Sequence, residues 1–121
     1  MKKILLLTLL FPLLSYCQTA YIDSLANSTY NIPNENDSAQ MFNYVLLVRA
    51  HIANQSIDSL LPVSIKAIEF AKKTNDPEHL TTAYNLNGVY YKTNKAFKKA
   101  ISVFNIGQKH AERINKPARI K

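Results

Sequence analysis

The sequence predicts an all-helical (all-α) fold built from stacked antiparallel helical hairpins. Only two Gly and five Pro occur in 121 residues, so few residues interrupt regular structure. The chain has no long alternation of β-branched and polar residues, which would indicate strands. The segment 70–77 also matches the segment 110–117, with Ala, Asn and Pro in the same positions. A period of about 40 residues is typical of helical repeats.

Length and composition indicate one small globular domain. Apolar residues make up 47% of the chain and charged residues 19%, which fits a chain that buries a core. The charge is uneven. Residues 18–91 contain four Lys or Arg and seven Asp or Glu, whereas residues 92–121 contain nine Lys or Arg and only Glu112.

Residues 1–17 are typical of a signal peptide, which predicts an exported protein of the periplasm or cell envelope. Two lysines precede an apolar run over 4–14, which is about half of the roughly 20 residues that span a bilayer. Ser15 and Cys17 are small residues suited to cleavage before Gln18. The mature chain 18–121 then has a formal charge of +5, because Lys2 and Lys3 are lost from a total of +7.

Two other interpretations of this segment stay open. In a lipoprotein, Leu14 to Cys17 would form a lipobox and Cys17 would be acylated, although Tyr16 stands where Gly, Ala or Ser is expected. An uncleaved anchor is disfavoured by the short apolar run. Cleavage before Gln18 would leave no cysteine, and therefore no disulfide or thiol chemistry.

The second repeat unit, 77–116, has the clearer helix signals. Asp76 is a good N-cap and Pro77 suits the first helical position, so the first helix is expected over 77–93. After a turn at 94–95, the second helix is expected from Phe97 to about Ile114, with the segment 115–117 ending it before a proline.

The first repeat unit, 37–76, is laid out in the same way. Asp37 or Ser38 is expected to cap a helix that ends near Ala53, and a second helix is expected over 57–73 after a turn at 54–56. Residues 18–36 are expected to be a linker with one or two helical turns near 21–26. Residues 117–121 are predicted to begin an incomplete third repeat.

The hairpins resemble tetratricopeptide (TPR) repeats of the long variety, whose units have about 40 residues. The resemblance covers about residues 37–121. Asn87 and Gly107 depart from the usual Leu and Ala of the family, and in the first unit Val48, His51 and Ser64 replace Gly, Tyr and Phe. The family's structural positions correspond in the second unit to Tyr84, Gly88, Tyr91, Phe97, Ala100 and Phe104.

The resemblance implies an α-solenoid, a right-handed superhelix in which the first helix of each unit lines a concave groove. The family binds peptides or partner proteins there and has no catalytic machinery of its own. The groove positions correspond to Phe42, Val45, Arg49 and Ile52 in the first unit and to Thr82, Asn85, Val89 and Lys92 in the second. A sharper hypothesis is that Arg49, Asn85 and Lys92 together hold a peptide carboxylate.

Two units are fewer than the three or more that solenoids usually need. Ile106 and Ile114 are therefore candidates for an uncovered apolar edge. We expect either a fragment of a longer protein or self-association through this edge.

No residue pattern predicts catalysis, a cofactor or a metal site. His51, His79 and His110 lack the spacing of metal ligands, and both glycines stand alone, so no phosphate loop is present. The chain is expected not to be an enzyme. The basic residues of 92–121 suit an acidic partner, such as an anionic peptide or membrane phosphates, and export argues against nucleic acid. A solvated helix face is the simpler explanation.

The leading functional hypothesis is a non-enzymatic scaffold that binds a protein or peptide outside the cytoplasm. The alternative is signal transduction. In that case the chain would be the truncated sensory region of a membrane-bound histidine kinase or transcriptional regulator, and the output part would follow Lys121.

Overall fold

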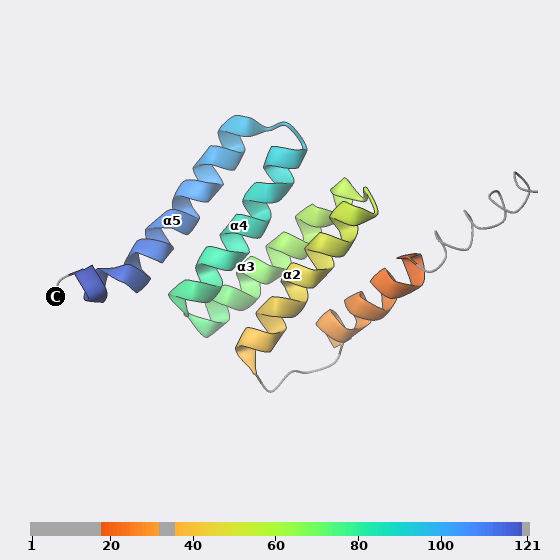
Figure 1. Cartoon of the computed structure of the whole chain (residues 1–121), viewed down its shortest axis with the longest axis horizontal. Helices are drawn as coiled ribbons and strands as arrows, with labels where there is room; N and C mark the ends of the chain where they lie inside the picture. The colour runs from red at the N-terminus through yellow and green to blue at the C-terminus, as the bar shows by residue number, and fades with distance from the viewer. Residues whose placement is uncertain (1–17, 32–35, 120–121) are drawn as a thin grey trace, which may run out of the picture.

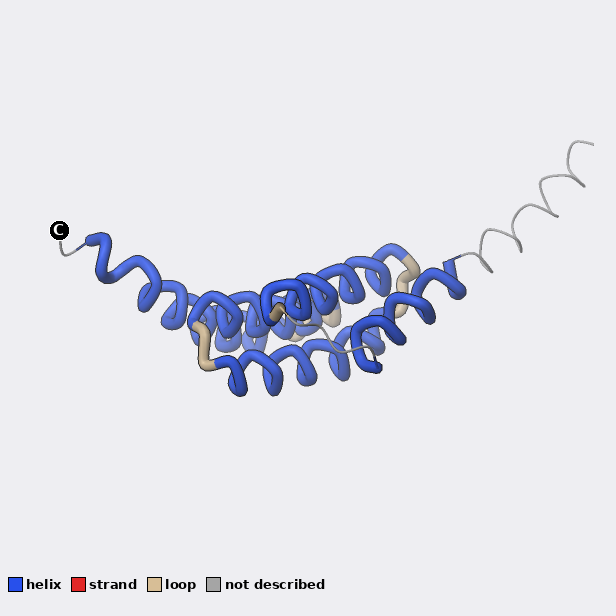
Figure 2. The backbone as a smooth tube through the Cα atoms, turned by 90° about the horizontal axis from the view of Figure 1, so that it is seen from below, coloured by secondary structure: helices blue, strands red, loops and turns tan. Residues whose placement is uncertain are grey.

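The computed structural model describes residues 18–31 and 36–119, with side chains described as far as Ile114. A helix over residues 18–31 comes first and is followed by the helices labelled in Figure 1. The described residues contain helices, turns and no strand, so the prediction of an all-α fold is confirmed (Figure 2). The elements are α2 (Asp37–Ala53), the 3₁₀ turn η1 (Ile57–Ser59), α3 (Leu60–Thr74), α4 (Pro77–Thr93) and α5 (Phe97–Arg119).

Helix α4 has the bounds that its sequence signals predict. The Asp76 side chain accepts a hydrogen bond from the Glu78 backbone N–H at 2.9 Å, and Pro77 opens the helix. The turn after α4 and the start of α5 at Phe97 also follow the prediction.

Four local expectations were wrong, and each has a physical reason. The cap of α2 is Asn36, whose side chain accepts from the backbone N–H groups of Ser38 and Ala39, so Asp37 already lies in the first turn. Helix α3 begins later than expected, at Leu60 after η1. Because Pro62 has no N–H, it fits only within the first turn of an α-helix.

The other two corrections concern the ends of the described chain. Residues 18–31 are helical throughout, which exceeds the one or two turns expected. Helix α5 continues through 115–117 to Arg119, so no third helix begins at Pro117 in the part that the structure describes. The φ of proline is helical, and near the end of a helix proline removes only one hydrogen bond. The predicted signal peptide 1–17, the linker residues 32–35 and residues 120–121 lie outside the described residues.

The repeat period of the sequence is also a period of the backbone. Residues Asn36 and Asp76 are N-caps with similar extended conformations. Residues Gln55 and Lys95 have positive φ values of 57° and 64° in the turns that follow α2 and α4. In these turns the N–H of Ser56 donates to the His51 carbonyl and that of Ala96 to the Tyr91 carbonyl, both at 2.8 Å. The two hairpins are therefore closed by the same hydrogen bonds.

The core lies between consecutive helices. Helices α2, α3, α4 and α5 pack on one another in order along the chain, and α2 also contacts α4. Small side chains line the inner surfaces of α3 and α4 and let their backbones approach closely. The fully buried core residues are Leu47 of α2, Leu60, Ala67 and Ala71 of α3, and Ala83 of α4.

A buried polar pair joins the two hairpins. The Asn87 side-chain amide of α4 donates to the Ser64 hydroxyl of α3 at 2.9 Å, and that hydroxyl donates to the Leu61 carbonyl at 2.9 Å. Both residues depart from the TPR pattern noted above. The structure places the two side chains opposite each other, so each provides a hydrogen-bond partner for the other.

We expect replacement of Asn87 with Ala to lower the free energy of unfolding by about 1–3 kcal/mol, because a buried polar contact is lost. The double variant Ser64→Ala with Asn87→Leu removes both polar partners and should lie closer to wild type. Urea denaturation of the three proteins measures the difference. A double variant that is less stable than Asn87→Ala would contradict this account.

Helix α4 approaches α5 most closely at Gly88. A Cβ atom at this position would lie 2.5 Å from Cε1 of the Phe104 ring. Glycine is therefore required by the contact between two helices and not by its own backbone angles, since neither glycine has a positive φ.

We expect Gly88→Ala to destabilise the fold by up to about 2 kcal/mol. Overpacking costs about 1–3 kcal/mol, and the gain in helix propensity offsets about 1 kcal/mol. Gly107→Ala is the matched control. The atom nearest to its Cβ would be Oδ1 of the exposed Asn85 side chain at 3.1 Å, while Tyr84 Cβ and the Thr81 carbonyl lie at ordinary contact distances of 3.5 and 3.6 Å. That variant should be as stable as wild type or more stable by up to about 1 kcal/mol. Thermal unfolding measures both, and equal stabilities of the two variants would contradict this account.

Candidate functional site

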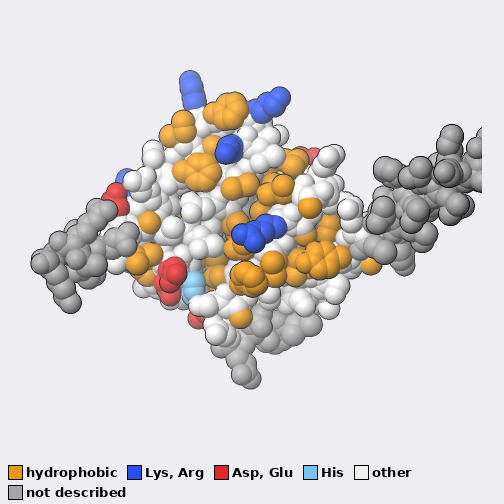
Figure 3. All heavy atoms as spheres, in the orientation of Figure 1, with side chains coloured by type: hydrophobic (Ala, Val, Ile, Leu, Met, Phe, Trp, Pro, Cys, Tyr) orange, Lys and Arg blue, Asp and Glu red, His pale blue; other side chains and the backbone are white. Residues whose placement is uncertain are grey.

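The residues expected to line a groove lie on two helices that touch, α2 and α4. Phe42, Val45 and Thr82 come together around a pocket of about 220 Å³ between the N-terminal halves of these helices. Hydrophobic side chains gather on this face, with separate Lys and Arg side chains among them (Figure 3). The pocket is lined by Ser38, Met41, Phe42, Val45, Glu78, His79 and Thr82.

The apolar wall of this pocket is open to solvent. Phe42 is 56% exposed although it is a large aromatic residue, and Ile52 further along α2 is 40% exposed. Exposed apolar side chains on one face are typical of interaction surfaces. We call the surface formed by Phe42, Val45, Ile52, Thr82 and Val89 the α2–α4 face.

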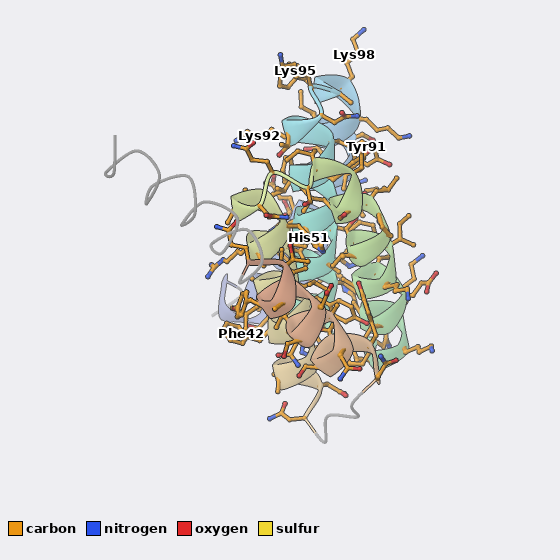
Figure 4. All side chains as sticks on the ribbon, turned by 90° about the vertical axis from the view of Figure 1, so that its right-hand side faces the viewer. Phe42, His51, Tyr91, Lys92, Lys95 and Lys98 are labelled. Carbon is orange, nitrogen blue, oxygen red and sulfur yellow. The ribbon has the colours of Figure 1, made fainter. Side chains whose placement is uncertain are left out.

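The positively charged residues lie away from the pocket. Figure 4 shows Phe42 and Lys92 on the same side of the molecule but toward opposite ends of it. Arg49 and Lys92 are exposed. This arrangement allows one extended partner to contact the pocket and a positive charge at once.

The structure does not bring Asn85 to the α2–α4 face. Its Oδ1 atom lies 3.1 Å from the Cβ position of Gly107, which places the side chain against α5. The expected grouping of Asn85 with Arg49 and Lys92 is therefore wrong. Asn85 lies at the boundary between the side of α4 that faces α2 and the side that faces α5. Its position in the sequence therefore does not decide which of the two helices its side chain meets.

His79 is a pocket residue that the sequence did not assign to the site. It is buried, and its Nδ1 lies 3.0 Å from the Thr74 hydroxyl, while its Nε2 lies 3.4 Å from the Ser38 hydroxyl. The Asp76 carboxylate lies 3.8 Å from the same Nε2. His79 thus ties α2 to the α3–α4 turn and fixes one wall of the pocket.

The structural positions of the second unit are packed, with one exception. Tyr84 stacks on His110 at 5.6 Å, and Tyr91 packs edge-on against Tyr90. Gly88, Ala100 and Phe104 lie between α4 and α5. Phe97 was expected to pack as well, but it is 58% exposed, because within the described residues no helix covers the outer side of α5.

A second pocket, of about 320 Å³, lies where helix 18–31 meets α2 and α3. Burial, with a smaller contribution from nearby Tyr44, raises the pKa of Tyr30 to about 12. The Lys66 ammonium lies 4.3 Å from the centre of the Tyr30 ring. The phenol stays protonated at neutral pH and supplies no base there. The lining residues are Thr29, Tyr30, Gln40, Tyr44, Lys66, Glu69, Phe70 and Lys73.

In the described part of the chain, no group of three or more His, Cys, Asp or Glu side chains is placed to hold a metal ion. None of the helices in the described ranges is both long enough and apolar enough to cross a membrane. Comparison of the chain with protein-family models, with curated proteins and with solved structures found no match.

His51 near the end of α2 combines burial with an unsatisfied nitrogen. Its Nδ1 is buried and has no hydrogen-bond partner among the described residues. Loss of hydration disfavours the charged imidazolium and lowers the pKa of His51 below 6.5. Protonation of this ring is therefore linked to unfolding.

We expect His51 to make the fold less stable as the pH falls below about 6.5, because the unfolded chain then binds a proton more readily than the folded chain. The contribution is fully present above that pH and is lost as the pH falls through the lower folded-state pKa. Urea denaturation between pH 7.5 and about pH 5 measures it. His51→Tyr, which introduces the residue found at the equivalent position of the second unit, Tyr91, should reduce the pH dependence. An unchanged pH profile would contradict this assignment.

Proposed function

We propose that this chain is a non-enzymatic scaffold that binds a protein or peptide partner on the α2–α4 face. In this proposal the two hairpins are TPR-like units of a right-handed α-solenoid, and the protein works outside the cytoplasm. The observation that carries the proposal is the open apolar pocket between the first helices of the two hairpins.

The backbone period supports the repeat part of the proposal. The caps at equivalent positions of the two units accept equivalent hydrogen bonds, from Ser38 N–H at Asn36 and from Glu78 N–H at Asp76. The turns that close the hairpins have equivalent bonds as well. A unit built twice with the same cap and turn is what a solenoid requires. The absence of a matching family model leaves the TPR resemblance resting on these residues.

The size of the pocket favours a polypeptide ligand over a small molecule. Its volume of about 220 Å³ is below the roughly 300–1,000 Å³ typical of small-molecule sites. Such a depression suits one apolar side chain of a partner that continues along the face. Phe42 would contact that side chain, since it is exposed at the rim of the pocket.

The exposed positive charges of Arg49 and Lys92 favour a partner with acidic residues. Arg49 and Lys92 are exposed, and neither has an ion-pair partner among the described residues. A partner with Asp or Glu beside its apolar anchor would pair with these residues. We therefore propose an acidic peptide segment with one large apolar side chain.

We expect Phe42→Ser to weaken binding of such a peptide by about tenfold or more, because it removes the apolar wall of the pocket. Peptides would be selected from a displayed random library against the immobilised full chain and measured by fluorescence anisotropy. Ile65→Ser is the matched control, since Ile65 is 44% exposed on α3 and lies outside the pocket. Selected peptides that bind Phe42→Ser as tightly as wild type would contradict the proposed site.

A further inference from the structure

The turn between α4 and α5 forms a basic tip with exposed apolar side chains. Phe97 and Ile101 are 58% and 61% exposed, the highest values among the large hydrophobic residues that the structure describes. Figure 4 shows Lys92, Lys95 and Lys98 grouped at this end of the molecule. We define the basic tip as Lys92, Lys95, Phe97, Lys98, Lys99 and Ile101.

The fold itself does not require lysines at this tip. The equivalent turn of the first hairpin, one repeat period earlier in the chain, has the same hydrogen bonds and the same positive φ position. Its residues at the four lysine positions are Ile52, Gln55, Asp58 and Ser59. The same turn is thus built with a charge of −1 in one hairpin and +4 in the other.

Two of these lysines stand where they oppose helix stability. Lys98 and Lys99 lie in the first turn of α5, which has no acidic residue, whereas α2 and α4 have Asp37 and Glu78 there. The helix dipole favours negative charge at this end and disfavours positive charge. Lys99 lies 4.9 Å above the Tyr91 ring, which offsets part of this cost.

We propose that the basic tip docks on an anionic membrane surface. The lysines would contact headgroup phosphates, while Phe97 and Ile101 enter the interfacial layer. Basic side chains interleaved with exposed apolar ones are the combination that binds such surfaces.

The surroundings of the tip favour a membrane over an acidic protein partner. Lys92, Lys95 and Lys98 lie together at the end of a hairpin (Figure 4), and no tip residue lines the pockets described above. No Asp or Glu occurs between Glu78 and Glu112, so this segment has no acidic side chain that would repel headgroup phosphates. This surface is separate from the peptide pocket, although Lys92 is also proposed to pair with an acidic residue of the peptide, so the tests below leave Lys92 unchanged.

The chain contains no Trp, which allows a site-specific reporter in the full-length protein. Phe97→Trp would report on the tip, and Phe42→Trp, at a site of nearly equal exposure on the α2–α4 face, is the control. Vesicles of phosphatidylcholine with or without phosphatidylglycerol would be titrated in. We expect a blue shift, and quenching by brominated lipid, only for Phe97→Trp and only with phosphatidylglycerol.

Charge variants in the Phe97→Trp background test the electrostatic part. Replacing Lys98 and Lys99 with Gln should lower the partition coefficient by about 25-fold, since each lysine near an anionic surface contributes about fivefold. The pair Lys72→Gln and Lys109→Gln removes the same charge from exposed sites outside the tip and should change it by no more than about threefold.

Several results would overturn the proposal. They are an unshifted Phe97→Trp spectrum, equal shifts of both reporters, and equal losses in the two charge variants. A Phe97→Trp response to polyglutamate as large as that to vesicles would instead indicate an acidic polypeptide partner. If the membrane tests fail but the variant with Lys98 and Lys99 replaced still binds peptide on the α2–α4 face, only the proposal for the tip is overturned and the proposed function stands.

Discussion

The close packing of α4 against both α3 and α5 determines how the rest of the chain is arranged. On one side Asn87 reaches the Ser64 hydroxyl at 2.9 Å, and on the other Gly88 leaves no room for a side chain against Phe104. Asn87 thus joins the two hairpins through a buried hydrogen bond, and Gly88, which has no Cβ atom, lets the two helices of the second hairpin approach closely. Because α2 also contacts α4, the position of α4 determines the shape of the α2–α4 face as well.

Local chemistry explains which parts of the fold could be predicted from the sequence. The combination of Asp76 and Pro77 defined the start of α4 because a side-chain cap and a proline act within one turn. The repeat period of the sequence predicted two equivalent turns, and their hydrogen bonds are equivalent. The cap of α2 was placed one or two residues too late, because Asn36, Asp37 and Ser38 are all good caps and residue type alone does not choose among them.

The candidate site was harder to predict because it depends on which neighbour each side of a helix meets. Phe42, Val45 and Thr82 gather at one pocket, as the resemblance to TPR repeats implied, whereas Asn85 turns to α5. His79 had no motif, and its place in the pocket wall comes from contacts with Thr74 and Ser38, which belong to other elements. Phe97 had a structural position in the pattern, yet no helix among the described residues covers it.

The two hairpins have the same backbone arrangement but differ in the residues at their turns. The shared backbone therefore does not explain why the second turn is rich in lysine. The capping side chains of Asn36 and Asp76 recur at equivalent positions of the two units. At the turns the two units differ in charge, as the change from Asp58 to Lys98 shows. Lysine at the start of α5 opposes the helix dipole. A feature that the first hairpin lacks, and that costs the second some stability, is best explained by an interaction outside the fold.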